Sequence, residues 1–387
     1  MEIVWLTSLL IVFYTYLGYG ALLFLMVLIK RVFHKPVQKT SNQIFEPHIS
    51  ILVAAYNEGD FIEQKIKNTL ELDYPKDKTE ILFITDGSSD STPEIVSRYS
   101  EIKLLHQVER QGKITAVARA MKYVSNPIVI FTDANTFLNK DAINCIVRHY
   151  KKPLVGGVAG EKRIFVRDKD AANAAGEGLY WKYESQLKKW DSELYSVVGA
   201  AGELFSIRTE LFEPVPHDTI IEDFYMTLRI AANGHKIVYE PEAFALEKPS
   251  ASVDEELKRK IRIAAGGIQA ISRLNHLLNI FKHGLLSFQY ISHRVLRWTV
   301  TPIALVALFI SNIFLLSDPF FQVTFLLQTL FYLLALIGFI FQKNKMKVKV
   351  FFIPYYFVLM NYSVFRGFFR FINGKQSVMW ERAKRSV

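Results

Sequence analysis

The sequence predicts an α/β fold: a doubly wound, mostly parallel sheet, with membrane-spanning helices on either side of it in the chain. Three observations lead to this prediction. Short apolar runs alternate with helical segments between residues 49 and 133. Polar residues follow these runs, and long charge-free runs lie near both ends of the chain. We therefore expect one sizeable domain between membrane segments.

Four apolar runs have the length and composition of buried parallel strands. They are Ile49–Ala55, Glu80–Thr85, Ile102–His106 and Ile128–Phe131. Helices are expected between them, up to about Leu70, from near Thr92 and over Ile114–Val124. Because open α/β sheets bind ligands at the carboxyl ends of their strands, Tyr56, Asp86 and Asp133 should gather at one edge.

Asp133 and Asn135 stand two residues apart at the end of the fourth strand. Their side chains are expected on the same side of an extended segment. Carboxylate and amide oxygens suit a hard cation such as Mg²⁺ or Mn²⁺. A strand followed by a simple Asp/Asn turn is the alternative, and the other motifs of the chain favour the metal site.

Long charge-free runs predict how the chain meets a membrane. Val4–Ile29 can span a bilayer, and its positive charges follow it, so we expect an uncleaved anchor with the next part of the chain in the cytoplasm. Trp298–Leu316 and Phe321–Phe341 are expected to form a helical hairpin through the membrane. Val350–Phe365 is shorter and interrupted by Pro354. We expect it to bend back or to lie at the interface, which leaves the basic tail in the cytoplasm.

The net charge of +10 does not indicate a nucleic-acid partner, because of where the charge lies. The chain from Lys343 onwards carries ten Lys/Arg and one Glu, and residues 30–39 add four Lys/Arg. The central domain is left near −2, and the basic excess lies beside the membrane segments, where it attracts anionic lipid. Cys145 is the single cysteine, which excludes an internal disulfide and suits a cytoplasmic domain.

Five motifs follow one another along the chain: Val53–Glu58, Thr85–Asp90, Gly112-Lys113, Thr132–Asn135 and Ile221–Asp223. Their order and spacing resemble those of the family 2 glycosyltransferases. With its hydrophobic runs the chain looks like the membrane-embedded branch, which includes cellulose, chitin, hyaluronan and poly-N-acetylglucosamine synthases. The resemblance, from about Ile49 to Gln269, implies a Rossmann-like GT-A domain with a mixed, mostly parallel sheet. It also implies an inverting, metal-dependent hexosyltransferase.

The same resemblance assigns residues to the donor. It implies that a nucleotide-sugar is bound by Ala55, Tyr56, Glu58, Asp86, Lys113, Asp133, Arg259 and Arg262. An aromatic face can stack on a base. Asp133 would hold the divalent cation with Asn135, which stands where the family has a second Asp. Plainer alternatives stay open: a turn and helix cap at Asp86, and a solvated lysine at a helix start for Lys113.

The catalytic base and the acceptor side are implied further along the chain. Glu222 and Asp223 begin a predicted helix, whose dipole favours the ionised form of both side chains. By resemblance Asp223 is the base that takes a proton from the acceptor hydroxyl, with Glu222 beside it. Gly199, Gly202 and Glu203 are expected on the acceptor side, although tight strand packing explains the small residues equally well.

The motif Gln-x-x-Arg-Trp of the processive members is only partly matched. Arg262 stands at the arginine and could neutralise the leaving diphosphate, but Arg259 replaces Gln and Ile263 replaces Trp. The missing aromatic platform weakens the case for long processive synthesis. We interpret Trp298 as an interfacial anchor of a membrane helix. A basic amphipathic helix on anionic lipid is the alternative for residues 258–262.

These patterns divide the chain into six segments. We expect a transmembrane helix over 1–30, a linker over 31–47, a cytoplasmic GT-A domain over 48–275, an interfacial amphipathic segment over 276–297, a transmembrane hairpin over 298–341, and a third membrane or re-entrant segment with a basic tail over 342–387. Residues 276–294 mix aromatic, apolar and basic side chains, which predicts a helix lying on the membrane. No zinc site is expected at His283 or His293, which lack carboxylate and cysteine neighbours at ligand spacing.

The expected function is transfer of a sugar, preferably from a UDP-sugar, to a growing glycan or a lipid-linked acceptor at the cell membrane. With so few membrane helices, a second copy of the chain or export subunits could complete a channel. The alternative is a catalytically inactive nucleotide-sugar sensor or scaffold of a polysaccharide secretion complex. Asp223 argues against it, because a non-catalytic domain needs no base. A transporter is excluded because the membrane runs lack an ionisable relay.

Overall fold

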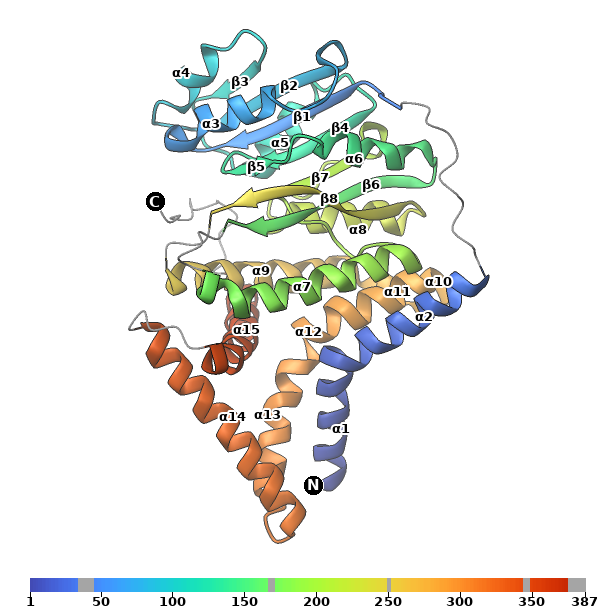
Figure 1. Ribbon diagram of the computed structural model, residues 1–387, viewed down its shortest axis with the longest axis vertical. Helices are drawn as coiled ribbons and strands as arrows, with labels where there is room; N and C mark the ends of the chain where they lie inside the picture. Colours follow the sequence, from blue (N-terminus) through green and yellow to red (C-terminus); the bar gives the residue numbers. More distant parts are fainter. Residues whose placement is uncertain (34–44, 166–170, 249–251, 344–348, 375–387) are drawn as a thin grey trace.

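The computed structural model describes the chain apart from residues 34–44, 166–170, 249–251, 344–348 and 375–387 (Figure 1). It has two regions: an α/β domain around one sheet, and a group of apolar helices that extend away from it (Figure 1). The N-terminus lies at the far end of the helical region. Most of the linker expected over 31–47 and the end of the basic tail fall outside the described residues.

An eight-stranded sheet forms the centre of the domain, in the order β3-β2-β1-β4-β7-β6-β8-β5. Its strands are β1 (Ile49–Ala55), β2 (Thr79–Asp86), β3 (Lys103–Gln107), β4 (Ile128–Asp133), β5 (Thr136–Leu138), β6 (Val155–Ile164), β7 (Leu204–Arg208) and β8 (Lys236–Glu247). The strands β3, β2, β1 and β4 are parallel to one another, and β6 is parallel to β8. β7 and β5 run antiparallel to their neighbours. The predicted mixed, mostly parallel sheet is therefore confirmed.

The register of the parallel strands brings their ends together. β1 is buried along its whole length, as expected for a strand covered on both faces. Ala54 of β1 pairs with Asp133 of β4, and Ala55 pairs with Thr85 of β2. The residues that follow these three strands therefore meet at one edge of the sheet, where the sequence predicts ligand binding.

Helices cover both faces of the sheet. They are α3 (Gly59–Leu70), α4 (Thr92–Ser97), α5 (Lys113–Met121), α6 (Ala142–Val147), α7 (Ala171–Leu194), α8 (Glu222–Ala232) and α9 (Val253–Arg273). α7 and α9 lie between the sheet and the apolar helices (Figure 1). The start of α9 is capped by Ser252, whose hydroxyl accepts from the amide of Glu255 at 3.2 Å. These two long helices connect the domain to the apolar helices.

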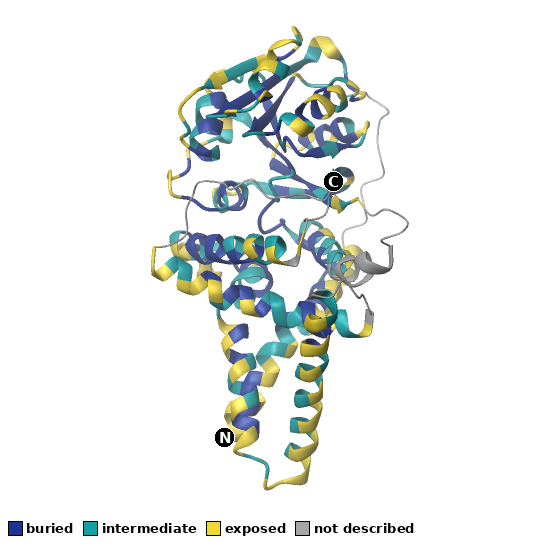
Figure 2. Ribbon diagram, turned by 90° about the vertical axis from the view of Figure 1, so that its left-hand side faces the viewer, coloured by how far each residue is buried: buried dark blue, intermediate teal, exposed yellow. Residues whose placement is uncertain are grey.

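Two of the described helices are long and apolar enough to cross a membrane, judged by length and composition. One is Glu2–Phe33, which comprises α1 (Glu2–Phe13), the π-helical η1 (Tyr14–Gly18) and α2 (Tyr19–Phe33), and the other lies within α14 (Pro319–Lys343). A third counts if Leu285–Trp298 and α13 (Val300–Ile313), bent by 53°, form one span. Exposed side chains predominate on these helices (Figure 2), as expected for surfaces that face lipid.

α15 (Lys349–Ile372) is longer than the run expected at residues 350–365 and continues through Pro354. It is not among the candidate spans of the described chain, and it packs along α9 and α14. A Cβ added to Gly367 would lie 2.8 Å from the Cβ of Ala264 in α9, so the two helices approach closely there. This crossing fixes the last described helix against the domain.

The prediction of one helix over residues 276–294 is wrong. The chain forms η6 (Asn275–Leu278), α10 (Ile280–His283), α11 (Leu285–Tyr290), the π-helical η7 (Ile291–Val295) and α12 (Leu296–Trp298). Gly284, with a φ of 53°, separates α10 from α11. The side chain of Phe281 is 99% exposed in α10, next to the exposed Ile280. Contact of this segment with a membrane surface stays a prediction.

Candidate active site

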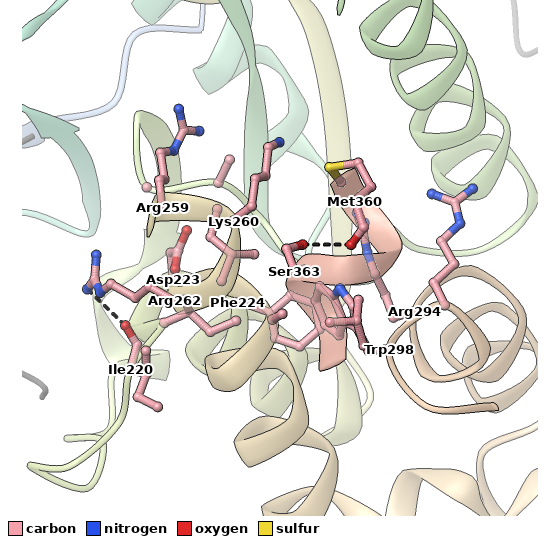
Figure 3. A pocket seen from close by; sticks show the side chains of 18 of the residues that line it. Ile220, Asp223, Phe224, Arg259, Lys260, Arg262, Arg294, Trp298, Met360 and Ser363 are labelled. Carbon is pink, nitrogen blue, oxygen red and sulfur yellow. Dashed lines mark hydrogen bonds between the residues drawn. The ribbon is translucent and has the colours of Figure 1, made fainter. Parts of the chain in front are cut away.

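Three segments that are far apart in the sequence bring charged side chains together at the edge of the sheet. Asp133 ends β4, Lys113 begins α5, and Glu222 and Asp223 begin α8. The Nζ of Lys113 lies 2.9 Å from a carboxylate oxygen of Asp133 and 2.9 Å from one of Glu222. All four side chains line one cavity of about 890 Å³, part of which Figure 3 shows. Residues expected to act as base, to bind the diphosphate and to hold a metal therefore share one site.

The two acids at the start of α8 differ in their pKa. Burial raises the pKa of Asp223 to about 7, and the charge of Glu222 adds to the rise. Burial also acts to raise the pKa of Glu222, but the charges of Lys113 and Arg262 bring it below its ordinary value. The prediction that the helix dipole keeps Asp223 ionised is wrong, because burial outweighs the helix start. A carboxyl group that titrates near neutral pH suits a general base.

A close contact at Gly199 fixes the position of Asp223. Gly199 has a φ of +94°, and a Cβ there would lie 2.1 Å from the ring of Phe224, the residue after Asp223. The hydroxyl of Thr227 donates to the carbonyl of Asp223 at 2.7 Å and accepts from the amide of Ala200 at 3.0 Å. The small residues near 199–202 therefore hold the first turn of α8 against the sheet.

Gly202 lies closer to the charged groups than Gly199 does. A Cβ on Gly202 would lie 3.4 Å from a carboxylate oxygen of Asp223 and 3.4 Å from the Nζ of Lys113. This distance is an ordinary van der Waals contact, so the backbone of residue 202 faces the two charged groups directly. A longer side chain at this position would project between them.

Glu203 and Arg259 belong to a separate group of charges on the cavity wall. Glu203 pairs with Lys162 and lies 3.5 Å from Arg259, which also lies 3.6 Å from Glu247. The side chains of Lys162 and Glu247 are almost fully buried. Arg259, expected to bind the donor, thus links α9 to the sheet through carboxylates.

Arg262 lies one turn further along α9 and nearer to the start of α8. Its guanidinium donates to the carbonyl of Ile220 at 3.0 Å, as Figure 3 shows. Its Nε is buried and has no hydrogen-bond partner in the described part of the chain. Arg262 is therefore better placed than Arg259 to meet a diphosphate in this cavity.

Asp133 and Asn135 offer oxygen atoms for a cation. Asn135 is buried, lines the same cavity, and has a side-chain oxygen without a hydrogen-bond partner among the described residues. Such orphaned oxygens are uncommon, and a divalent cation would satisfy this one. The pair therefore fits Mg²⁺ or Mn²⁺. No group of three or more His, Cys, Asp or Glu that could hold a metal occurs in the described ranges.

Lys65 is a fully buried lysine behind the site that the motifs did not single out. Its Nζ donates to the hydroxyl of Thr132 at 2.9 Å and to the carbonyl of Thr136 at 2.8 Å. Burial lowers its pKa to about 7. Lys65 therefore braces the turn that carries Asp133 and Asn135. Its position on the apolar face of α3, where a polar residue is unexpected, is the signal that could have revealed it.

Tyr56 and Asp86, expected to bind the nucleoside, lie beside a smaller hollow that Ala55 also lines. The guanidinium of Arg110 lies 3.7 Å from the centre of the Tyr56 ring, on a face where a base could stack. The carboxylate of Asp86 accepts from the amide of Gly112 at 2.6 Å and from that of the preceding residue. The carboxylate of Asp86 therefore holds the loop that leads into α5, and its contact with a nucleoside stays a prediction. Glu58, at the start of α3, is buried and does not line this hollow.

Trp298 lines the cavity, and its interpretation as an interfacial anchor stays a prediction. Its ring centre lies 5.3 Å from that of Phe224, in an edge-to-face arrangement. A Cβ added to Gly267 of α9 would lie 2.3 Å from the indole, so the ring packs directly on that glycine. The chain bends immediately after Trp298, at the break between α12 and α13. This bend directs the indole to the cavity beside Asp223 (Figure 3).

His293 is surrounded by acids that sequence spacing did not reveal. Its Nδ1 lies 2.5 Å from Asp191, and its Nε2 lies 3.2 Å from Glu184, both in α7. Tyr19 of α2 donates to Asp191 as well. These side chains are buried and connect α2, α7 and η7. Spacing along the sequence cannot reveal these acids, because they lie about a hundred residues before His293.

The sequence of the sheet region resembles a known family. Residues 50–215 match the model of Glycosyl transferase family 2. The match includes Lys113, Asp133 and Gly199, and Asp223 follows just beyond it.

The chain also has named relatives. The chain is 29% identical over 235 residues to the poly-beta-1,6-N-acetyl-D-glucosamine synthase of Staphylococcus aureus (strain MSSA476), and 27% identical over 235 residues to the protein of the same name from Staphylococcus epidermidis. Each alignment covers 58% of this chain and 56% of the relative. The chain thus spans about half the length of the curated relatives that it matches.

A solved structure is similar over almost the whole chain. It is a mannosyltransferase from Pyrobaculum calidifontis in complex with GDP-Man and Mn²⁺, with a TM-score of 0.69 and 23% sequence identity. The similarity covers 95% of this chain and 99% of that one. It confirms the predicted GT-A fold of the domain.

Proposed function

We propose that this chain is a membrane-bound, inverting glycosyltransferase of extracellular polysaccharide synthesis. It would move a sugar from a nucleotide-sugar to a hydroxyl group of a glycan or a lipid-linked acceptor. The observation that carries the proposal is the meeting of Lys113, Asp133 and Asp223 in one cavity at the carboxyl ends of the parallel strands. This edge is where α/β sheets bind nucleotides, and the three side chains supply a cation, a metal ligand and a base.

The donor half of the proposed site runs from Tyr56 to Asp133. Tyr56 and Asp86 would contact the base and ribose once Arg110 leaves the face of the Tyr56 ring. Lys113 would bind the diphosphate, because its ammonium lies at the centre of the charged group. Arg262 has unused hydrogen-bonding capacity and would face the same phosphates.

Asp133 and Asn135 would hold a divalent cation. When bound there, such an ion supplies positive charge that stabilises a diphosphate as it leaves. The unpartnered oxygen of Asn135 supports this assignment. The Mn²⁺ in the similar mannosyltransferase is consistent with it.

Asp223 would act as the base of the transfer. The acceptor hydroxyl gives its proton to Asp223 while its oxygen forms a bond to the anomeric carbon. The bond between that carbon and the diphosphate oxygen breaks, and its electron pair leaves with the nucleoside diphosphate. Attack from the side opposite to the leaving group inverts the anomeric carbon, and no covalent sugar–enzyme intermediate is needed.

The proposed location is the cell membrane, with several spans and the family 2 domain on the cytoplasmic side. The candidate spans and their exposed apolar surfaces support membrane insertion. Lys30 and Arg31, directly after the first apolar run, support a cytoplasmic domain by the positive-inside rule. The names of the staphylococcal relatives support a role in polysaccharide synthesis.

Nucleotide release from a panel of donors tests the proposal. The purified full chain in detergent would be given UDP-N-acetylglucosamine, UDP-glucose or GDP-mannose with Mg²⁺ or Mn²⁺, and donor binding would be measured by calorimetry. We expect nucleotide release from one donor, a UDP-sugar, and loss of that release when EDTA is added. The absence of both binding and release for every donor would overturn the proposal.

A further inference from the structure

The cavity that contains Asp223 extends well beyond the donor residues. Its volume of about 890 Å³ is near the upper end for small-molecule sites, about 300–1,000 Å³. Its lining reaches Tyr16 in η1, inside the first candidate span, and Arg297 at the end of α12. It also includes residues of α15 from Met360 to Arg370, and Asn373 just after that helix. The cavity therefore continues to the level at which the domain passes into its apolar helices.

Two arginines form one wall of this membrane-side end. Arg294 and Arg297 lie 2.8 Å and 2.9 Å from the carboxylate of Glu184. Their side chains are only 14% and 11% exposed, and that of Glu184 is 4% exposed. His293 shares the same carboxylate at 3.2 Å. One buried acid thus orients two guanidinium groups, and positive charge remains in excess at this wall.

Two further arginines lie on α15, which contains no acidic residue. Arg366 and Arg370 both line the cavity and are one helical turn apart. Arg366 donates to the hydroxyl of Tyr362 at 3.0 Å, and no carboxylate pairs with it among the residues that the structure describes. The close packing of Gly367 on α9 holds this face of α15 against the domain. A second pair of arginines therefore lines the same cavity.

The charge balance of the lining agrees with an anionic ligand. Eleven lysines and arginines line the cavity among its described residues, against seven carboxylates. Most of these carboxylates already meet a cation, as Glu255 meets Lys258 at 2.8 Å and Glu222 meets Lys113 at 2.9 Å. The lining therefore carries more positive than negative side chains, and Glu256, which lies outside it, also meets Arg259 and Lys260.

We propose that the membrane-side end of the cavity binds the diphosphate headgroup of a lipid-linked sugar acceptor. This inference rests on the proposed function. The four arginines 294, 297, 366 and 370 would bind phosphate oxygens, since guanidinium groups match their geometry. The sugar of the acceptor would extend from the headgroup to Asp223, and the lipid chain would leave between apolar helices. The nucleophile is the sugar hydroxyl, because an ionised phosphate needs no base.

Binding of a prenyl diphosphate tests this inference without knowledge of the acceptor sugar. Calorimetry on the full chain in detergent would compare farnesyl diphosphate, farnesol and inorganic diphosphate, with the donor site filled by a saturating nucleoside diphosphate. We expect farnesyl diphosphate to bind at least tenfold more tightly than either of the other two. Equal binding of farnesol would overturn the inference, and equal binding of inorganic diphosphate would show a free-phosphate site in place of a lipid site.

Arginine variants test where farnesyl diphosphate binds. Arg366→Gln and Arg370→Gln together should weaken farnesyl diphosphate about tenfold and leave nucleoside diphosphate binding unchanged. Arg98→Gln, which removes an exposed arginine after α4, is the matched control and should change neither. An unchanged affinity for farnesyl diphosphate in the double variant would contradict the inference. Intact donor binding without lipid diphosphate binding would sink this inference alone, whereas absent donor binding would sink the proposed function.

Discussion

The Nζ of Lys113 lies 2.9 Å from Asp133 and 2.9 Å from Glu222, so one lysine joins a carboxylate at the end of β4 to one at the start of α8. This arrangement makes the lysine part of the binding surface and also the partner of two largely buried acids. Removing a cation that pairs with a buried acid is strongly destabilising.

Lys113→Met should therefore reduce both activity and stability. We expect nucleotide release to fall about a hundredfold, as for the removal of one group that stabilises charge in a reaction. We also expect destabilisation by about 3 kcal/mol, because two carboxylates lose their shared partner. Lys67→Met is the control, since Lys67 pairs with Glu63 on an exposed helix face and should change stability by less than about 1 kcal/mol. Similar stabilities of the two variants in urea unfolding would contradict this account.

Alanine substitutions at Gly199 and Gly234 form a matched pair that tests the close contact between Gly199 and the ring of Phe224. Both have a positive φ, of 94° and 93°, but a Cβ at Gly234 would meet no atom within 4 Å. Gly234→Ala should cost about 1 kcal/mol for the backbone conformation alone. Gly199→Ala should cost about 1–3 kcal/mol more, because its methyl group displaces Phe224. Nucleotide release should fall for Gly199→Ala and stay near wild type for Gly234→Ala, and equal effects would disprove the role of the contact.

Substitution of Trp298 should raise the KM for the acceptor more than the KM for the donor. Trp298→Ala removes the aromatic wall beside Asp223, and we expect the KM for the acceptor to rise about tenfold, within the range of one aromatic contact. Trp298→Phe should restore most of the affinity. Gly267→Ala should resemble Trp298→Ala, because a Cβ there would lie 2.3 Å from the indole. A rise in donor KM with an unchanged acceptor KM would contradict this assignment.

Asn135 allows a test of the cation site. Asn135→Asp adds a second negative charge beside Asp133, so the Mn²⁺ concentration that gives half-maximal activity should fall about tenfold. Asn135→Leu should raise it, because an apolar side chain offers no oxygen. Titration of nucleotide release with Mn²⁺ measures both changes. If all three proteins need the same concentration, Asn135 is not a ligand.

The strands and the edge where they meet could be predicted from the sequence, because local patterns determine them. The apolar run that ends at Asp133 has no polar alternation, and only a doubly covered strand explains that. The start of α8 at Glu222 follows equally local signals. The antiparallel strand β7, inserted between β4 and β6, depends on pairing between distant segments and has no local signature.

The residues that the sequence did not reveal share this dependence on distant partners. Trp298 reaches the cavity only because the helix bends after it and Gly267 leaves room for its ring. Lys65 and His293 acquire their roles from side chains on other elements. The ionisation of Asp223 was misjudged for the same reason, because the helix start is local but burial is not.

Asp223 tests the central claim most directly, by its pH dependence and by its replacement. Since burial raises its pKa to about 7, the rate of transfer should fall about tenfold for each pH unit below that value and level off above it. The charges of Lys113 and Arg262 bring the pKa of the neighbouring Glu222 below its ordinary value instead.

The decisive measurement is nucleotide release by Asp223→Asn, alongside calorimetric binding of the donor. The variant is nearly isosteric, and Asp77→Asn at an exposed position is the control. We predict that donor binding is retained, that turnover falls by about a thousandfold or more, and that the dependence on pH near 7 disappears from the residual rate. Wild-type turnover by Asp223→Asn, with the pH profile unchanged, would contradict the assignment of Asp223 as the base.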